Sequence, residues 1–377
     1  MSSTKTPPGR RAVLIGRVMV VYCVLLSLAV VWVVLFPPPP YDVHRPDFGV
    51  FWAVSSMLGG QTDQIYDPVA VTEAQSFIAD PSLGLFPWVY PPTALGLVAP
   101  FSWLPFWTAY AVWIAISVLV FMFAVRRLAG QVWPVILLLA MASFPYWTAV
   151  KAGQLALFLA ALVIAAVLAL ERRPILAGVL IAVIGLIKPQ LMILAPVALI
   201  AGGHWRAFIS AGVVTVVAVA ATLVIFGPQI WRDWFDALSG FPEILVGLGI
   251  ETHAVTWRSF LTELGLDGTI RTVAHVAGAV FAVGLAALIF ARTRDPRIWL
   301  VGLVGCAFFI TPYAMKYDLL ILLPVAGWLL VRPKHGYLDW WLALTGFALF
   351  FPIPPIAGAV LVLFVPSVAF AAITQRL

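Results

Sequence analysis

Long runs of apolar residues, separated by short polar segments, dominate the chain from residue 12 to residue 373. A run of about 20 apolar residues is long enough to cross a bilayer as one helix. The apolar runs predict membrane-spanning helices over residues 12–36, 94–125, 132–150, 155–170, 175–201, 207–226, 273–291, 298–310, 318–331, 338–351 and 356–373.

The run over 175–201 admits two interpretations. It is either one tilted span or two short helices that meet at Lys188-Pro189, because a proline disfavours helix at the residue before it. One span would leave His204 and Arg206 outside, whereas the split keeps the following loop basic and cytoplasmic. With the split, the pattern predicts an all-α polytopic membrane protein of about twelve spans, with residues 1–377 forming one integral membrane domain.

Basic residues lie mainly between the apolar runs and before the first of them. The positive-inside rule therefore predicts that both termini are cytoplasmic. Two longer polar segments, 37–93 and 227–272, are then external loops, and we expect amphipathic helices at the membrane interface within the first. Short basic loops inside and long loops outside are the arrangement expected of a protein that works at the outer face.

Composition supports a membrane protein and narrows its chemistry. The chain is 63% hydrophobic and 10% charged, which excludes soluble enzymes and soluble nucleic-acid binders. The net charge of +6 is explained by the basic loops, so no nucleic-acid partner is expected. Cys23 and Cys306 lie in apolar runs, and the sequence has no phosphate-loop or H-E-x-x-H motif. We therefore expect no metal and no other cofactor.

Asp47 is the acidic residue that follows the first apolar run, at the head of an amphipathic stretch over 48–58. A carboxylate in a partly desolvated cleft can act as a general base and take a proton from a hydroxyl. An Asp before a helix is equally well explained as its N-cap. The spacing alone does not choose between these roles. The nearby Asp42 and His44 are expected to be ordinary loop residues.

In the first external loop, Tyr66-Asp67-Pro68 is typical of a turn, and the aromatic residues Trp88 and Tyr90 have two possible roles. They fit an aromatic belt at the membrane interface. Rings in an aqueous cleft can also stack on a sugar. The residues alone leave both roles open.

Polar residues also occur at three helix junctions. Lys151 and Gln154 mark the first junction, Lys188 the second, and the segment 311–318 the third. A lysine at a break within the membrane is either a counter-ion, for instance to a phosphate, or a side chain that reaches the interface. Lys316 and Asp318 have a further possibility, which is to pair with each other. The second external loop adds His253 and Arg258.

Several short motifs, taken in order, resemble those of glycosyltransferase family 87. The resemblance covers about residues 45 to 330, and its residues are Asp47-Phe48-Gly49-Val50-Phe51-Trp52, Gly60, Ile65-Tyr66-Asp67-Pro68, Tyr90-Pro91-Pro92, Gly153-Gln154, Arg173, Ala177-Gly178, Lys188-Pro189, Thr311-Pro312-Tyr313 and Tyr317-Asp318-Leu319.

The resemblance implies a GT-C fold with a catalytic carboxylate on the first external loop, which here is Asp47. It implies a polyprenyl-phosphate sugar as donor, a glycolipid or polysaccharide hydroxyl as acceptor, and inversion at the sugar carbon. It also implies a bacterial cytoplasmic membrane with the active site on the periplasmic or extracellular side. The family's mannosyltransferase branch uses a histidine near a Ser-Pro break, whereas Thr311-Pro312-Tyr313 has none. Whether the sugar is mannose therefore stays open.

An anionic phosphate leaving group needs fixed positive charge close to it. The candidate donor-phosphate ligands are Lys188, Lys316, Lys151 and Arg258. The expected substrate-lining residues are Tyr66, Trp88, Tyr90, Gln154, His253, Tyr313, Tyr317 and Asp318.

A secondary transporter is the alternative function, because about twelve helices with breaks near the midplane also suit that class. The chain shows no internal repeat, and acidic residues are nearly absent from its apolar runs. Both observations favour the transferase. A scaffold or lipid-binding protein is the third possibility.

Overall fold

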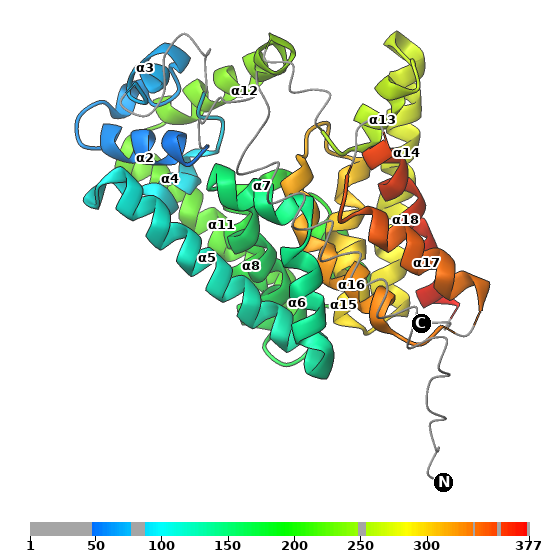
Figure 1. Cartoon of the computed structure of the whole chain (residues 1–377). Coiled ribbons are helices and arrows are strands. Elements are labelled where there is room, and N and C mark those ends of the chain that lie inside the picture. The colour runs from blue at the N-terminus through cyan, green and yellow to red at the C-terminus, as the bar shows by residue number, and fades with distance from the viewer. Residues whose placement is uncertain (1–46, 77–86, 248–253, 335, 353–355, 375–377) are drawn as a thin grey trace, which may run out of the picture.

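The computed structural model describes residues 47–76, 87–247, 254–334, 336–352 and 356–374 (Figure 1). This part of the chain is built of helices, with one isolated bridge between Ala254 and Met315, so the all-α prediction is confirmed for it. The predicted first span, 12–36, together with Asp42, His44 and His253, lies outside the described residues.

The α-helices are α2 Phe48–Met57, α3 Pro68–Glu73, α4 Leu95–Val98, α5 Phe106–Ala129, α6 Trp133–Met141, α7 Phe144–Ala152, α8 Ala156–Ala169, α9 Pro174–Ile187, α10 Ala195–Ala201, α11 Trp205–Phe226, α12 Gln229–Gly247, α13 Trp257–Glu263, α14 Gly268–Arg292, α15 Pro296–Leu300, α16 Leu323–Val331, α17 Tyr337–Ala348 and α18 Ile356–Ile373. Short 3₁₀ segments and one π-helical segment connect several of them.

Within the described residues, three helical segments are long and apolar enough to cross a membrane. They are Phe106–Met141, which combines α5 and α6, together with α11 and α14. The pair α7 and α8, bent by 119°, adds a fourth if it is one broken span. These helices support a membrane protein, but they do not confirm about twelve spans. Other predicted spans form shorter helices, such as the 12 residues of α17.

The run over 175–201 is broken where the sequence places the break. Helix α9 ends at Ile187, Lys188 leaves the helical conformation with φ −132° and ψ 81°, and α10 begins only at Ala195. The prediction of two short helices is therefore confirmed, and a single continuous helix over this run is excluded.

Helix α2 differs from the prediction that it lies on the membrane interface with one apolar face down. It is buried on nearly all sides, and the ring of Phe48 packs against Phe101, Phe106 and Tyr110 at centroid distances of 5.0, 5.8 and 5.6 Å. The physical reason is that α2 itself carries apolar residues on nearly every face, so neighbouring parts of the protein pack against it on most sides. Among the described helices, α12 is strongly amphipathic.

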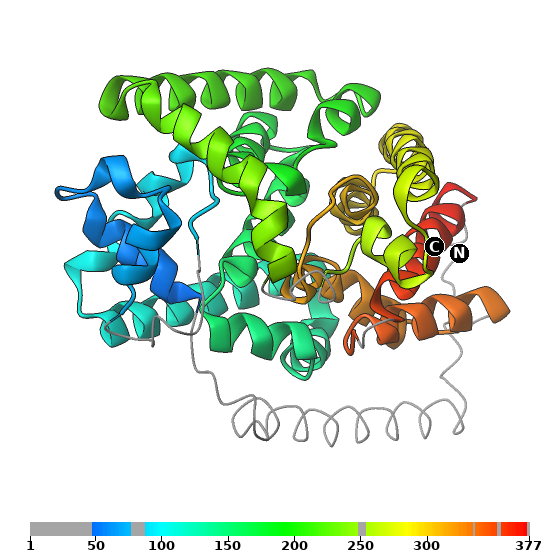
Figure 2. The same cartoon turned by 90° about the horizontal axis from the view of Figure 1, so that it is seen from above.

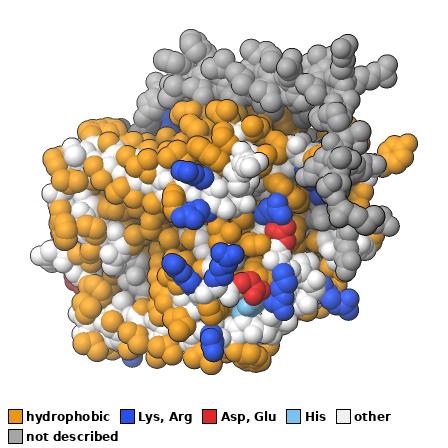
Figure 3. Space-filling view, turned by 90° about the horizontal axis from the view of Figure 1, so that it is seen from below, with side chains coloured by type: hydrophobic (Ala, Val, Ile, Leu, Met, Phe, Trp, Pro, Cys, Tyr) orange, Lys and Arg blue, Asp and Glu red, His pale blue; other side chains and the backbone are white. Residues whose placement is uncertain are grey.

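Arginine and lysine residues gather on one face of the molecule (Figure 3). We call this end the basic face; basic residues stand here at the helix ends and turns of α5–α6, α8–α9, α10–α11, α14–α15 and α16–α17 (Figure 1), and they are Arg126, Arg127, Arg172, Arg173, Arg206, Arg292, Arg294, Arg297, Arg332 and Lys334. Contacts join these loops, since Arg294 donates to the Glu171 carboxylate and to the Gly202 carbonyl. Helices α3, α12 and α13 lie at the opposite end (Figure 1).

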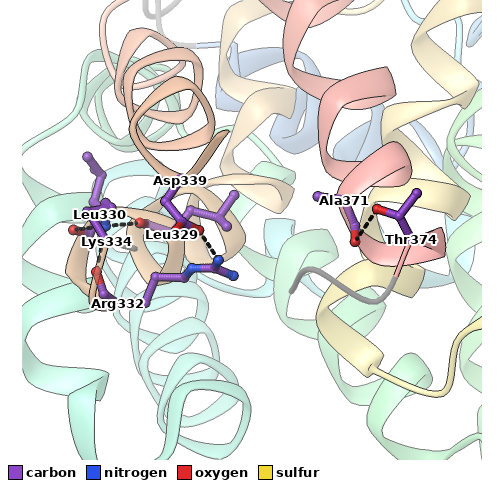
Figure 4. A network of polar contacts seen from close by, with 7 residues as sticks. All are labelled: Leu329, Leu330, Arg332, Lys334, Asp339, Ala371 and Thr374. Carbon is purple, nitrogen blue, oxygen red and sulfur yellow. Dashed lines mark hydrogen bonds and ion pairs between the residues drawn. The ribbon is translucent and has the colours of Figure 1, made fainter. Parts of the chain in front are cut away.

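The turn between α16 and α17 shows how a basic loop is fixed (Figure 4). Lys334 Nζ donates to the carbonyls of Leu329 and Leu330 at 2.7 and 3.0 Å, and Arg332 forms an ion pair with Asp339. A cation that binds the last carbonyls of a helix satisfies its unpaired acceptors and its dipole. This turn therefore ends α16 and sets the direction of α17.

Candidate functional site

Asp47 lies at the start of α2, and its carboxylate does not cap that helix. Its Oδ2 instead accepts a hydrogen bond from Gln154 Nε2, which comes from the junction of α7 and α8. The N-cap interpretation of Asp47 is therefore wrong. The contact brings together two residues that the sequence analysis had singled out separately.

A glycine allows this contact. Gly153 ends α7 with a left-handed φ of 68°, and a Cβ at this position would lie 2.6 Å from Phe48 Cβ and 2.9 Å from the Tyr110 ring. Glycine adopts this conformation without the steric cost of other residues. The junction is tied to α5, because the Tyr110 hydroxyl donates to the Val150 carbonyl at 2.7 Å and Trp113 Nε1 donates to the Gly153 carbonyl at 3.2 Å.

Lys188 and Asp318 form a buried ion pair at the next two helix breaks. Lys188 Nζ lies 2.7 Å from Asp318 Oδ1, and the two side chains are 5% and 3% exposed. The lysine also lies over the Tyr317 ring, 5.1 Å from its centroid, and Asp318 Oδ2 accepts from the Met315 amide at 3.0 Å. Asp318 therefore pairs with Lys188, which is distant in the sequence, and not with the neighbouring Lys316.

Tyrosines surround the two carboxylates. Burial raises the pKa of Tyr90, Tyr313 and Tyr317, and the negative charges of Asp318 and Asp47 raise each of them further. The three tyrosines therefore lie within electrostatic reach of both carboxylates. These hydroxyls stay protonated at neutral pH and can donate hydrogen bonds.

The aromatic residues Tyr66, Trp88 and Tyr90 belong to the same site. Trp88 packs on Tyr90 with ring centroids 4.9 Å apart, and the Tyr66 hydroxyl donates to the Tyr90 carbonyl at 2.8 Å. Trp88 and Tyr66 are both buried in the protein, at 1% and 7% exposure. An aromatic belt facing lipid therefore does not describe Trp88.

The titration of Asp47 is shifted towards neutral pH. Burial raises its pKa from 3.8 to about 6, while the hydrogen bond from Gln154 and the positive charge of Lys188 act in the opposite direction. A general base works best when its pKa is close to the operating pH. The environment of Asp47 is therefore suited to proton transfer.

The other three candidate cations have different neighbours. Lys151 lies in the last turn of α7, and Lys316 lies 5.7 Å from the centroid of the Phe144 ring, where its charge acts on Glu263. Arg258 is on α13, which packs against α14 and α18. Lys188 is the cation that the structure places beside Asp318 and within electrostatic reach of Asp47.

Helix α12 crosses over the neighbouring helices in the view from above (Figure 2), and it contacts the site, a placement that was not predicted from the sequence. Its Trp234 Nε1 donates to the Val89 carbonyl at 3.2 Å, and its Phe241 ring lies 5.4 Å from the ring of Tyr313. The helical period of apolar residues within 229–247 was the signal that could have revealed it. A cavity of about 420 Å³ separates α12 from Tyr66 and the Asp67 turn.

Among the described residues, no group of three or more His, Cys, Asp or Glu side chains is placed to hold a metal ion. The site consists of carboxylates, one lysine, one amide and tyrosines. Such groups can accept a proton, bind an anion and donate hydrogen bonds to hydroxyl-rich ligands.

Comparison with known proteins gives one finding. The sequence model of glycosyltransferase family 87 matches residues 88–312, which is more than half of the chain. The matched range contains Gln154 and Lys188, whereas Asp47 and Asp318 lie outside it, so their placement rests on the geometry. Searches among curated proteins and among solved structures find no match.

Proposed function

The chain belongs to glycosyltransferase family 87 and is a membrane glycosyltransferase, and we propose that its sugar donor is a polyprenyl-phosphate sugar and its acceptor a hydroxyl of a glycolipid or polysaccharide. Such a donor stays in the bilayer, which suits an enzyme with membrane-spanning helices next to its site. The family supports a transferase over a transporter.

The observation that carries the mechanism is the contact between Asp47 and Gln154 beside the Lys188–Asp318 pair. In the proposed reaction, the acceptor hydroxyl loses its proton to Asp47 and its oxygen attacks the anomeric carbon. The bond from that carbon to the phosphate oxygen breaks, and the phosphate leaves with the electron pair. Attack from the face opposite the phosphate inverts the anomeric centre.

Gln154 is proposed to orient both the base and the substrate. Its Nε2 donates to Asp47, which fixes the direction of the amide, since an ionised carboxylate can only accept. Its Oε1 is buried and has no hydrogen-bond partner in the described part of the protein. A buried acceptor without a partner is costly. A substrate hydroxyl that donates to Oε1 would remove this cost and lie next to the base.

Lys188 is proposed to bind the leaving phosphate. A lysine ammonium has three N–H donors, of which Asp318 accepts one. Fixed positive charge near the developing anion lowers the barrier to its departure. Lys188 pairs with Asp318 and its charge acts on Asp47, so we assign this role to Lys188.

The basic face supports a cytoplasmic orientation for that end of the protein. Helices α3, α12 and α13 lie at the opposite end, and α12 packs over Tyr313 of the site. We therefore propose a bacterial cytoplasmic membrane as the location, with the reaction on the periplasmic or extracellular side and both termini in the cytoplasm.

The test uses purified protein with radiolabelled polyprenyl-phosphate mannose, glucose, galactose and arabinofuranose, and membrane extract as acceptor. We expect transfer from one donor, lost by at least about 100-fold in Asp47→Asn. The matched control is Asp267→Asn, which changes an exposed carboxylate in the loop before α14. Full transfer by folded Asp47→Asn would exclude the proposed base, and consumption of no donor would contradict the donor class.

A further inference from the structure

A groove of about 850 Å³ opens on the basic face between α5, α8 and the segment that joins α8 to α9, and none of the candidate site residues lines it. Arg127, Arg172 and Arg173 line it together with Glu171, and Val120 and Phe123 of α5 are among its apolar residues. The groove therefore combines positive charge with an apolar wall. Its place on the basic face separates it from the candidate catalytic site.

The charges in this groove are not balanced within the described residues. Its carboxylate, Glu171, lies 3.4 Å from Arg294, which is outside the lining. No carboxylate of the described chain pairs with Arg127, Arg172 or Arg173, and all three are exposed. Guanidinium groups bind phosphate well, because their planar donors match its oxygens.

The apolar wall distinguishes a lipid from a free anion. Phe123 is 55% exposed and Leu176 is 42% exposed, and Phe123 lies on the membrane-crossing segment that begins with α5. A soluble phosphate would contact only the arginines and leave this surface uncovered. An acyl chain along α5, joined to a phosphate at the arginines, would use both parts.

We propose that this groove binds an anionic phospholipid of the leaflet at the basic face. Its phosphate contacts Arg127, Arg172 and Arg173, and one acyl chain lies against Val120 and Phe123. Basic pockets between helices on the cytoplasmic side are suited to anionic headgroups. This lipid is distinct from the sugar donor, and the proposal does not depend on the proposed reaction.

The test is native mass spectrometry of the purified full chain in detergent, titrated with phosphatidylglycerol or phosphatidylcholine. We expect one phosphatidylglycerol to bind preferentially. The triple variant Arg127→Gln/Arg172→Gln/Arg173→Gln should weaken its binding by at least about tenfold. The matched control, Arg126→Gln/Arg206→Gln/Arg292→Gln, removes the same charge from the same face but outside the groove lining, and should bind as the wild type does.

Three results would overturn the proposal: equal binding of both lipids, equal loss in the two triple variants, or displacement of the lipid by millimolar inorganic phosphate. The last would show a site for a soluble anion. Should the groove variant aggregate, the single variants Arg127→Gln and Arg172→Gln replace it. Each is then expected to weaken binding about fivefold, and unchanged binding in both would overturn the proposal.

Discussion

Gln154 Nε2 donates a hydrogen bond to Asp47 Oδ2 across 107 positions of sequence, and Gly153 provides the space for this contact. Gln154, which follows this glycine, carries the amide. Phe48, which follows Asp47, fills the space that a Cβ at position 153 would need. The geometry of the candidate base thus depends on a residue with no side chain.

Gly153→Ala is expected to impair both stability and transfer. The new Cβ needs a strained φ of 68° and would clash with Phe48, which would push Asp47 away from Gln154. We expect unfolding several degrees lower and transfer reduced at least about tenfold. Gly212→Ala is the control, because its Cβ would meet nothing within 4 Å and alanine favours helix. Wild-type activity in Gly153→Ala would contradict this role of the glycine.

The pH profile should report the titration of Asp47. A base acts when deprotonated, so kcat/KM should fall as the pH drops below a midpoint of about 6. The hydrogen bond from Gln154 lowers this pKa, so Gln154→Leu should move the acidic limb to higher pH. Transfer rates between pH 4.5 and 8 would show both effects. An acidic limb that is unmoved in Gln154→Leu would argue against this assignment.

Asp47→Asn is expected to be inactive and yet more stable than the wild type above pH 6. The folded pKa is about 6 against 3.8 for a free carboxyl, so the folded protein binds this proton more tightly. The contribution of Asp47 to the free energy of unfolding is therefore most favourable at low pH. It is lost as the pH rises from about 4 through about 6. At pH 8 the asparagine removes a cost of up to about 3 kcal/mol.

Thermal unfolding at pH 4 and pH 8 measures this difference. The midpoint of thermal unfolding should be higher in Asp47→Asn than in the wild type at pH 8, and the two should be equal at pH 4. Asp267→Asn, with its exposed carboxyl, should leave both midpoints unchanged. A gain of equal size at both pH values would show that ionisation of Asp47 is not its cause.

The sequence was sufficient for features that depend on local chemistry. The break at Lys188-Pro189 follows from the backbone restriction that proline imposes, and the last apolar run, 356–373, has the bounds of α18. It was not sufficient for the environment of α2. A bilayer and a protein core are equally apolar, so the apolar residues of 48–58 did not show that this helix packs inside the protein and not on the membrane interface.

The candidate site was predictable as a set of residues but not as a set of contacts. Asp47, Gln154, Lys188 and Asp318 all stood out as polar groups beside helix ends or breaks. Which lysine meets which carboxylate depends on packing over 130 positions, and the nearer Lys316 does not take that place. The burial that shifts the pKa of Asp47 likewise arises only when α2 packs into the protein.

Variants of the buried Lys188–Asp318 pair can distinguish a structural role of Lys188 from a catalytic one. Lys188→Met leaves the Asp318 carboxylate uncompensated at 3% exposure, which should cost about 3–5 kcal/mol of unfolding free energy. The double variant Lys188→Met/Asp318→Leu removes both charges and should recover most of that stability, because apolar pairs of similar volume replace buried ion pairs at little cost. Chemical unfolding in detergent measures both.

Transfer assays on the same variants then decide the role of Lys188. If Lys188 binds the donor phosphate, the double variant should remain at least about 100-fold slower than the wild type despite its recovered stability. A stable double variant with wild-type transfer would show that the pair serves only the fold, and the phosphate ligand would then have to be another cation.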